Sequence, residues 1–252
     1  MKITLLMMLS LYCLKISAFN HDHVHWDEIL KKNTQLKSSQ VLVDYKALKK
    51  NPNQLNQYLD DLKKVKPSQF ASFSEKQKLA FWINAYNAFT IDIVLKHYPI
   101  ESIKEIKSGW FSSGPWKIEF ITLLGKTISL DEIEHNIIRK RFDEPRIHFA
   151  LNCASLGCPS LYQQAFNAKH LDTQLQSAAL HFLTNKKKNY LKGDTLYLSK
   201  IFKWYGDDFQ NKYKSYKNFI IETLQLKKEQ NQNKEENYKI EFNEYDWKLN
   251  GL

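Results

Sequence analysis

The chain has 252 residues, of which 43% are hydrophobic and 13% aromatic, so its composition excludes an intrinsically disordered protein and suits one large domain with a real core. The formal net charge is +10, but the lysines are scattered over the whole sequence and form no basic stripe. This distribution argues against nucleic-acid binding. It leaves weak electrostatic attraction to anionic surfaces as the only expectation that the charge supports.

The first 18 residues have the pattern of a secretory signal peptide. Lys2 supplies a positive charge, an apolar run from Ile3 to Leu14 follows, and Ala18 is a small residue at which a signal peptidase would cut. The apolar run is too short to span a membrane, and no later segment approaches the length of about 18 apolar residues that a span needs. We therefore expect cleavage after Ala18 and export of a soluble chain to the periplasm or the medium.

Residues 19–66 are predicted to form an N-terminal helical extension. The stretch from His21 to His25 holds three alternate histidines, which we interpret as a polar, flexible new N-terminus, with adventitious metal binding as the alternative. A helix is expected over 26–36. Another is expected to begin at Asn51-Pro52, because apolar residues recur at helical spacing after this capping pair.

The longest predicted helix begins at Ser74 with a capping box and ends before a proline. It is apolar nearly all round, which is typical of a central, buried helix. Asn84 and Asn87 lie three residues apart on one face of it. Because buried amides need hydrogen-bond partners, we expect both to reach toward the loop over 109–116 or toward the segment 146–152.

A hairpin across Gly125 is predicted next, followed by a helix that Ser129 caps and that carries Glu134 and His135. The remainder of the chain predicts an amphipathic helix from Asn167, a hairpin around 193–194, a short helix after Ser199, a helix near 216–226 and a strand over 238–247.

We expect a strand over 146–152, because large apolar residues alternate with small or polar ones there. The residues on its predicted core face are Ile147, Phe149 and Leu151. His148 and Asn152 would then share the other face and line a polar pocket. These elements together predict an α+β fold, in which a central, mainly antiparallel sheet with hairpins packs against the long helix and several amphipathic helices. The order of elements loosely resembles papain- and transglutaminase-like folds.

Four segments carry a combination of motifs that is familiar. They are FWINAYNA at 81–88, SLDEIEH at 129–135, RIHFALNCAS continuing to Cys158-Pro159 at 146–159, and YDWKLN at 245–250. This combination resembles the bacterial branch of the domain-of-unknown-function family 547. The resemblance covers about residues 70–205 and implies a family domain over 67–252, completed by the C-terminal helix and strand. It implies a domain and a site, and no reaction.

Cys153 and Cys158 are the two cysteines that remain after cleavage, and in an oxidising compartment they can close a small disulfide loop. Our favoured hypothesis is a cleft above this disulfide that binds a small molecule or peptide. The side chains expected to line the cleft are Trp82, Asn84, Tyr86, Asn87, Trp110, Trp116, His135, Arg146 and His148.

A thiol-dependent hydrolase or transferase is the alternative hypothesis. Cys153 would be the nucleophile and His148 its base, and Asn152 or Glu134 would orient the imidazole. In a straight strand His148 and Cys153 point to opposite faces, so the chain would have to bend at Cys153. His135 is the other candidate base.

A zinc site or redox exchange at the two thiols are further alternatives. Cys153, Cys158, His148 and His135 contain the ligand types of a zinc site, but the spacing of the cysteines is looser than in the usual zinc knuckle. We therefore assign no metal ligand and no cofactor. A bond between the two sulfurs would support the disulfide, whereas a thiol within hydrogen-bond reach of an imidazole would support the enzyme.

Overall fold

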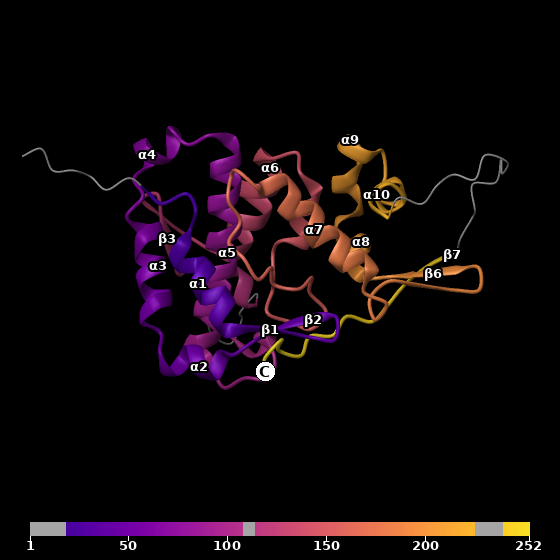
Figure 1. Cartoon of the computed structure of the whole chain (residues 1–252), viewed down its shortest axis with the longest axis horizontal. Helices are drawn as coiled ribbons and strands as arrows, with labels where there is room; N and C mark the ends of the chain where they lie inside the picture. Colours follow the sequence, from indigo (N-terminus) through magenta and orange to yellow (C-terminus); the bar gives the residue numbers. More distant parts are fainter. Residues whose placement is uncertain (1–18, 108–113, 225–238) are drawn as a thin grey trace, which may run out of the picture.

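The computed structural model describes residues 19–107, 114–224 and 239–252 (Figure 1). The predicted signal peptide and Trp110 lie outside these residues. Helices and three small sheets make up the described part, which confirms the predicted α+β class. Among its helices, none combines the length and the apolar character needed to cross a membrane.

The elements follow one another from α1 to β7 along the chain. The helices are α1 (Val24–Asn33), α2 (Tyr45–Lys50), α3 (Asn53–Lys63), α4 (Pro67–Ala71), α5 (Glu75–His97), α6 (Arg139–Arg141), α7 (Leu171–Thr184), α8 (Lys200–Tyr205), α9 (Gln210–Tyr213) and α10 (Tyr216–Thr223). The strands are β1 (Thr34–Lys37), β2 (Gln40–Val43), β3 (Ile121–Leu123), β4 (Lys126–Ile128), β5 (Tyr190–Lys192), β6 (Thr195–Leu198) and β7 (Lys239–Phe242). The short 3-10 helices are η1 (Ile103–Glu105), η2 (Pro115–Lys117), η4 (Pro145–Phe149) and η5 (Gly206–Phe209), and η3 (Glu132–Ile138) is a π-helix.

Helix α5 is the centre of the main hydrophobic core. Ser74 and Gln77 form the predicted capping box at its start. Every side chain from Leu79 to Leu95 is buried, so the helix is surrounded by protein on all sides, as its apolar sequence predicts. The core cluster includes residues of the segment 19–66, which we predicted as an N-terminal extension, together with residues from the rest of the chain as far as α7.

The N-terminal segment is ordered against this core, which corrects part of our interpretation of residues 21–25. His23 is only 2% exposed, and its Nδ1 lies 2.7 Å from the hydroxyl of Tyr58. Trp26 stacks on the same tyrosine with a centroid distance of 5.6 Å. A flexible polar terminus is therefore wrong at His23, because a buried phenol supplies the partner that the imidazole needs. The helix predicted over 26–36 ends at Asn33, and strand β1 begins at Thr34.

The sheets are small and lie at different places on the molecule (Figure 1). Strands β1 and β2 form one antiparallel hairpin, and β3 and β4 form the hairpin predicted across Gly125. Gly125 has a φ of +76°, a backbone conformation that glycine adopts without strain. Strand β5 pairs antiparallel with β6, and β7 adds to β6 in parallel. Helix α5, instead of a sheet, occupies the middle of the fold.

The strand predicted over 146–152 is wrong, because this segment begins with the 3-10 helix η4. The carboxylate of Glu144 accepts the N–H of Arg146, and the N–H of Ile147 reaches the carbonyl of Glu144. These local bonds and Pro145 at the first helical position favour a helical turn over an extended chain. Phe149 and its apolar neighbours are buried as predicted, but His148 is buried as well.

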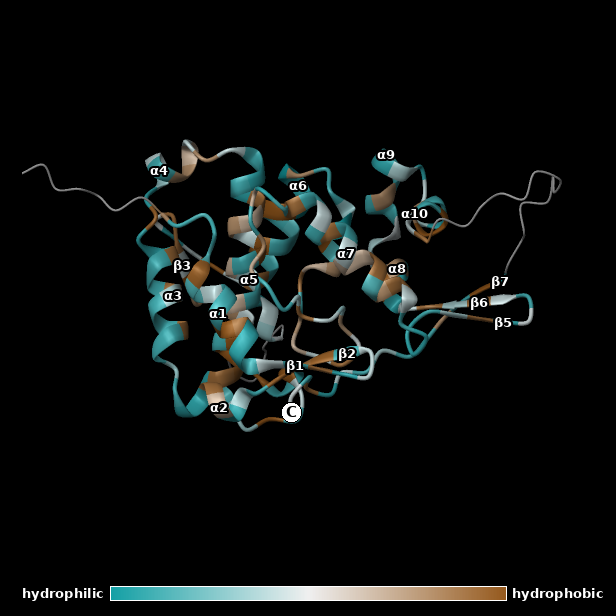
Figure 2. Cartoon of the chain, in the orientation of Figure 1, coloured by the Kyte–Doolittle hydropathy of each residue, from teal (hydrophilic) through white to brown (hydrophobic). Residues whose placement is uncertain are grey.

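A second hydrophobic cluster fills the space between α7, α8, η5 and α10. Phe149 is completely buried at its centre. The aromatic rings around it are those of Phe182, Phe202, Phe209 and Phe219. In Figure 2, hydrophobic and hydrophilic residues alternate along α7 and α8, as expected for helices that cover a core with one face. This cluster fixes the backbone on which His148 stands.

Candidate functional site

A partly open cavity of about 330 Å³ lies above the segment 148–159. Its aromatic lining comes from Tyr86, Trp116, Trp204, Tyr205, Tyr245 and Trp247. Its polar and ionisable lining comes from Lys117, Asp131, Glu134, His135 and His148. Both cysteines border it too. Side chains from widely separated parts of the sequence therefore meet at one hollow.

Cys153 and Cys158 are joined by a disulfide, and their Cα atoms are 6.0 Å apart. The bond confirms the predicted pairing and leaves no free thiol at the cavity. The two sulfurs differ in exposure, since Cys158 is 1% exposed and Cys153 is partly exposed. The backbone N–H of Cys153 donates to the sulfur of Cys158 at 2.8 Å, and the hydroxyl of Tyr245 lies 3.3 Å from each sulfur.

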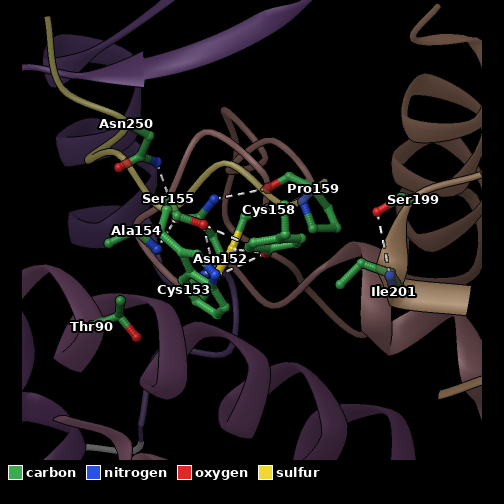
Figure 3. The surroundings of a disulfide bond; sticks show 12 residues. Thr90, Asn152, Cys153, Ala154, Ser155, Cys158, Pro159, Ser199, Ile201 and Asn250 are labelled. Atoms are coloured by element: carbon green, nitrogen blue, oxygen red, sulfur yellow. Dashed lines mark hydrogen bonds between the residues drawn. A yellow bond between two sulfur atoms is a disulfide. The ribbon is translucent and has the colours of Figure 1, made fainter. Parts of the chain in front are cut away.

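Asn152 shapes the loop that carries the disulfide, as Figure 3 shows. Its amide donates to the carbonyl of Pro159 at 2.8 Å, and its side-chain oxygen accepts the N–H of Ala154 at 3.0 Å. The amide of Asn250 donates to the same oxygen. Asn152 is buried among these partners and is not part of the cavity lining, so the structure does not bring it together with His148 at this cavity.

Gly157 is the point at which the C-terminal segment lies against this loop. A Cβ at this position would come within 2.8 Å of the ring of Tyr245 and 2.9 Å of the carbonyl of Asp246. The N–H of Gly157 donates to that carbonyl at 2.7 Å. The close approach requires glycine, and it places Tyr245 and Trp247 along the cavity.

His148 is held in one orientation by two partners. Its Nε2 lies 2.7 Å from Oδ2 of Asp208, and its ring stacks on Tyr205 with centroids 4.0 Å apart. Burial lowers the pKa of His148 below its ordinary value of 6.5, although the hydrogen bond with Asp208 opposes this. The imidazole is therefore neutral at pH 7 and donates its Nε2 proton to the carboxylate.

Asp208 is the carboxylate that our sequence reasoning missed. Its two oxygens accept bonds from Nε and a terminal nitrogen of Arg139, both at 2.7 Å. Burial opposes ionisation, but the hydrogen bonds from Arg139 and His148 hold the pKa of Asp208 well below its usual range. Arg139 also lies 2.8 Å from Nδ1 of His135. No local motif links residue 208 to residue 148, and only the fold brings them together.

Glu134 and two tyrosines form a second polar group at the cavity. Glu134 is 9% exposed on the π-helix η3. Burial and the nearby charge of Glu134 raise the pKa of Tyr86 and of Tyr205 well above the ordinary value. Both phenols therefore remain protonated and can donate hydrogen bonds at any physiological pH.

The two asparagines of α5 connect segments of the backbone and do not line the cavity. Asn87 donates to the carbonyl of Ala150 at 2.9 Å and accepts the N–H of Asn152 at 2.8 Å, so its expected reach toward 146–152 is confirmed. Asn84 instead bonds both backbone groups of Phe166. The structure thus places both amides against the main chain, which satisfies them, and not at this cavity.

Trp82 and Arg146 also lie away from the cavity. Trp82 is 3% exposed and packs in the core against Phe70 at 5.7 Å. Arg146 pairs with Glu144 at 2.7 Å and with Asp172 at 2.6 Å, and it is not among the residues that line the cavity. We assigned them to the site from the sequence because they share motifs with Tyr86 and His148, which do line the cavity.

The zinc alternative finds no support in the residues that the structure describes. Within them, no three His, Cys, Asp or Glu side chains lie close enough together to hold a metal ion. The two sulfurs that such a site would need are bonded to each other.

Comparison with curated proteins and with solved structures gives no match to this chain. A family model does match, over residues 70–183, and its description is "Protein of unknown function, DUF547". The matched segment contains helix α5, the π-helix η3, the segment with His148 and both cysteines. The resemblance seen in the sequence is thus confirmed as a match of residues 70–183 to the DUF547 family model.

Proposed function

We propose that this chain is an exported binding protein, whose cavity takes a small polar molecule or the end of a peptide and whose disulfide is a fixed part of the cavity wall. The observation that carries the proposal is the convergence of six aromatic side chains and several ionisable ones on one hollow of about 330 Å³. Pockets with apolar walls and a few oriented polar groups are the usual form of small-molecule sites.

The aromatic side chains form a continuous wall. Tyr245 lies between Trp204 and Trp247, with ring centroids 4.8 Å and 4.6 Å from its own. Trp116 continues the wall at 5.7 Å from Trp247. Trp204 is 44% exposed, so a large apolar ring faces solvent beside the cavity. Such rings offer flat contact surface to a ligand at low cost in conformational entropy.

The polar groups are arranged before any ligand arrives. His148 is fixed by Asp208 and Tyr205, and Asp208 is fixed by Arg139. Because these side chains lose little freedom on binding, more of the contact energy is available for affinity. The disulfide and the apolar N-terminal run of the sequence both suit a chain that works outside the cytosol.

The test is a binding screen by thermal shift and tryptophan fluorescence. The probes are N-acetylated hexosamines, dipeptides with free termini and aromatic carboxylates. Trp204→Ala removes the exposed ring at the cavity, and Leu191→Ala is the matched control, because Leu191 is 53% exposed on β5 and lies outside the cavity. A bound probe should keep its affinity in Leu191→Ala and lose about thirtyfold in Trp204→Ala. Saturable binding by none of the three classes, or equal affinity in both variants, would overturn the proposal.

A thiol-dependent hydrolase or transferase is the second candidate, and one observation favours it. Cys153 and His148 border the same cavity, and Asp208 orients His148 in the way that an aspartate orients the histidine of a catalytic triad. This chemistry requires the disulfide to be reduced first. Native protein should show a mass deficit of two protons and no alkylation. After reduction, alkylation of Cys153 near pH 6 that is lost in His148→Ala would support the enzyme.

A further inference from the structure

The first described residues of the chain contain three nitrogen atoms that make no hydrogen bond to the described part of the chain. The sequence here is Phe19-Asn20-His21, directly after the predicted cleavage site. The backbone N–H groups of Asn20 and His21 donate no hydrogen bond within the described residues. Nδ1 of His21 is buried and has no partner there either. Asn20 is exposed and His21 partly buried, so the burial of an unbonded Nδ1 at His21 is the notable feature of this part of the described chain.

The surrounding contacts hold this segment in place. The ring of Phe19 stacks on Phe73 at 5.8 Å, and the ring of His21 meets the same phenylalanine edge-on at 4.3 Å. Asn20 accepts the N–H of Asp22 through its side chain and the N–H of His23 through its carbonyl. Those bonds use oxygen atoms of Asn20, so they leave its nitrogen free.

A histidine at the third position of a free N-terminus can chelate a metal ion through nitrogen alone. The α-amine, the two following backbone nitrogens and Nδ1 of the histidine then close two five-membered rings and one six-membered ring around the metal. Four nitrogens in a plane suit Cu(II) best and Ni(II) next, whereas Zn(II) prefers a tetrahedral set. A proline at the second or third position would remove a backbone N–H, and this chain has none there.

We propose that, after removal of residues 1–18, the new N-terminus binds one Cu(II) ion through the amine of Phe19, the backbone nitrogens of Asn20 and His21, and Nδ1 of His21. The inference rests on the predicted cleavage after Ala18 and is independent of the cavity. Binding displaces the protons of the amine and of the two amides, so it weakens as the pH falls.

The neighbouring histidines do not supply the same ligand set. Nδ1 of His23 is taken by the hydroxyl of Tyr58, and His25 lies 3.1 Å from the carboxylate of Asp61. His21 is thus the histidine of this stretch whose Nδ1 is unpartnered, and it is the one at the third position.

The experiment uses the full chain, expressed with its own N-terminus, recovered after export and freed of metal with a chelator. Intact mass establishes the first residue, and copper sulfate is then added while visible absorption and electron paramagnetic resonance are recorded. We expect one bound copper per chain, with the spectrum of a planar four-nitrogen site and release of protons. An N-terminus at a residue other than Phe19 would overturn the proposal.

Three variants separate this site from adventitious binding. His21→Ala should lose the planar spectrum, whereas His25→Ala, which removes an exposed histidine four residues away, should keep it. A glycine inserted between Phe19 and Asn20 moves the histidine to the fourth position and keeps every ligand group, and it should also abolish the spectrum. Retention of the spectrum in His21→Ala or in the insertion variant would overturn the proposal. Unchanged thermal unfolding of the metal-free variants shows that the fold is intact.

Discussion

Replacing Phe149 with alanine tests whether the second hydrophobic cluster supports the site. The side chain is fully buried, and four other phenylalanine rings surround it with centroids between 5.1 Å and 6.1 Å away. Truncation of a buried phenylalanine costs about 3–5 kcal/mol of unfolding free energy, depending on how far the cavity collapses. Rings on several sides resist collapse, and aromatic pairs add to the area contribution, so we expect a loss near 5 kcal/mol.

The assay is urea unfolding followed by circular dichroism, at constant temperature and pH. Leu191→Ala, in an exposed strand, is the control and should change the unfolding free energy by less than about 0.5 kcal/mol. The midpoint of Phe149→Ala should fall with little change in the slope. A loss below about 2 kcal/mol at unchanged slope would show that the cluster repacks and that our account of it is wrong.

Three further predictions concern single features of the chain. Asn87→Ala leaves the Ala150 carbonyl and the Asn152 N–H unpaired and should cost about 2–5 kcal/mol in the same urea assay; a cost below about 1 kcal/mol would contradict this. Burial lowers the pKa of Lys188 from 10.5 to about 7, so the unfolded chain binds this proton more tightly than the folded chain. The stability of the wild type relative to Lys188→Met should therefore rise by about 2 kcal/mol from pH 7 to pH 9, and a constant difference would refute the shift. Mature chain recovered after export should begin near Phe19, and an intact Met1 in that material would exclude the signal peptide.

The sequence predicts those features that depend on neighbours in the chain. The capping box at Ser74, the apolar composition of α5 and the turn at Gly125 are local signals, and all three are confirmed. The pairing of Cys153 with Cys158 is also confirmed, and the sequence could predict it because these two cysteines are close together in the chain. Local patterns succeed where the interaction partners are close in sequence.

Contacts between distant residues are the part that escapes prediction. The alternation of apolar residues at 146–152 predicted a strand. The segment instead begins with a 3-10 turn that is buried on more than one side, and this burial produces the same alternation. Asp208 follows His148 by 60 residues, and no spacing rule links the two. Arg146 was assigned to the cleft because it adjoins His148 in sequence, yet it turns toward Glu144 and Asp172. In a short 3-10 turn such as η4, tertiary packing decides which way each side chain points, and sequence spacing does not.

The contact between Gly157 and the C-terminal segment has a consequence for the order of events during biosynthesis. Tyr245 follows Cys158 by 87 residues, and a polypeptide is made from its N-terminus onward. The two cysteines are therefore delivered well before the residues that cover them. If the two sulfurs are oxidised at that stage, the last part of the chain packs over a bond already formed. A chain interrupted before Tyr245 can thus be correctly oxidised and still lack one wall of its cavity.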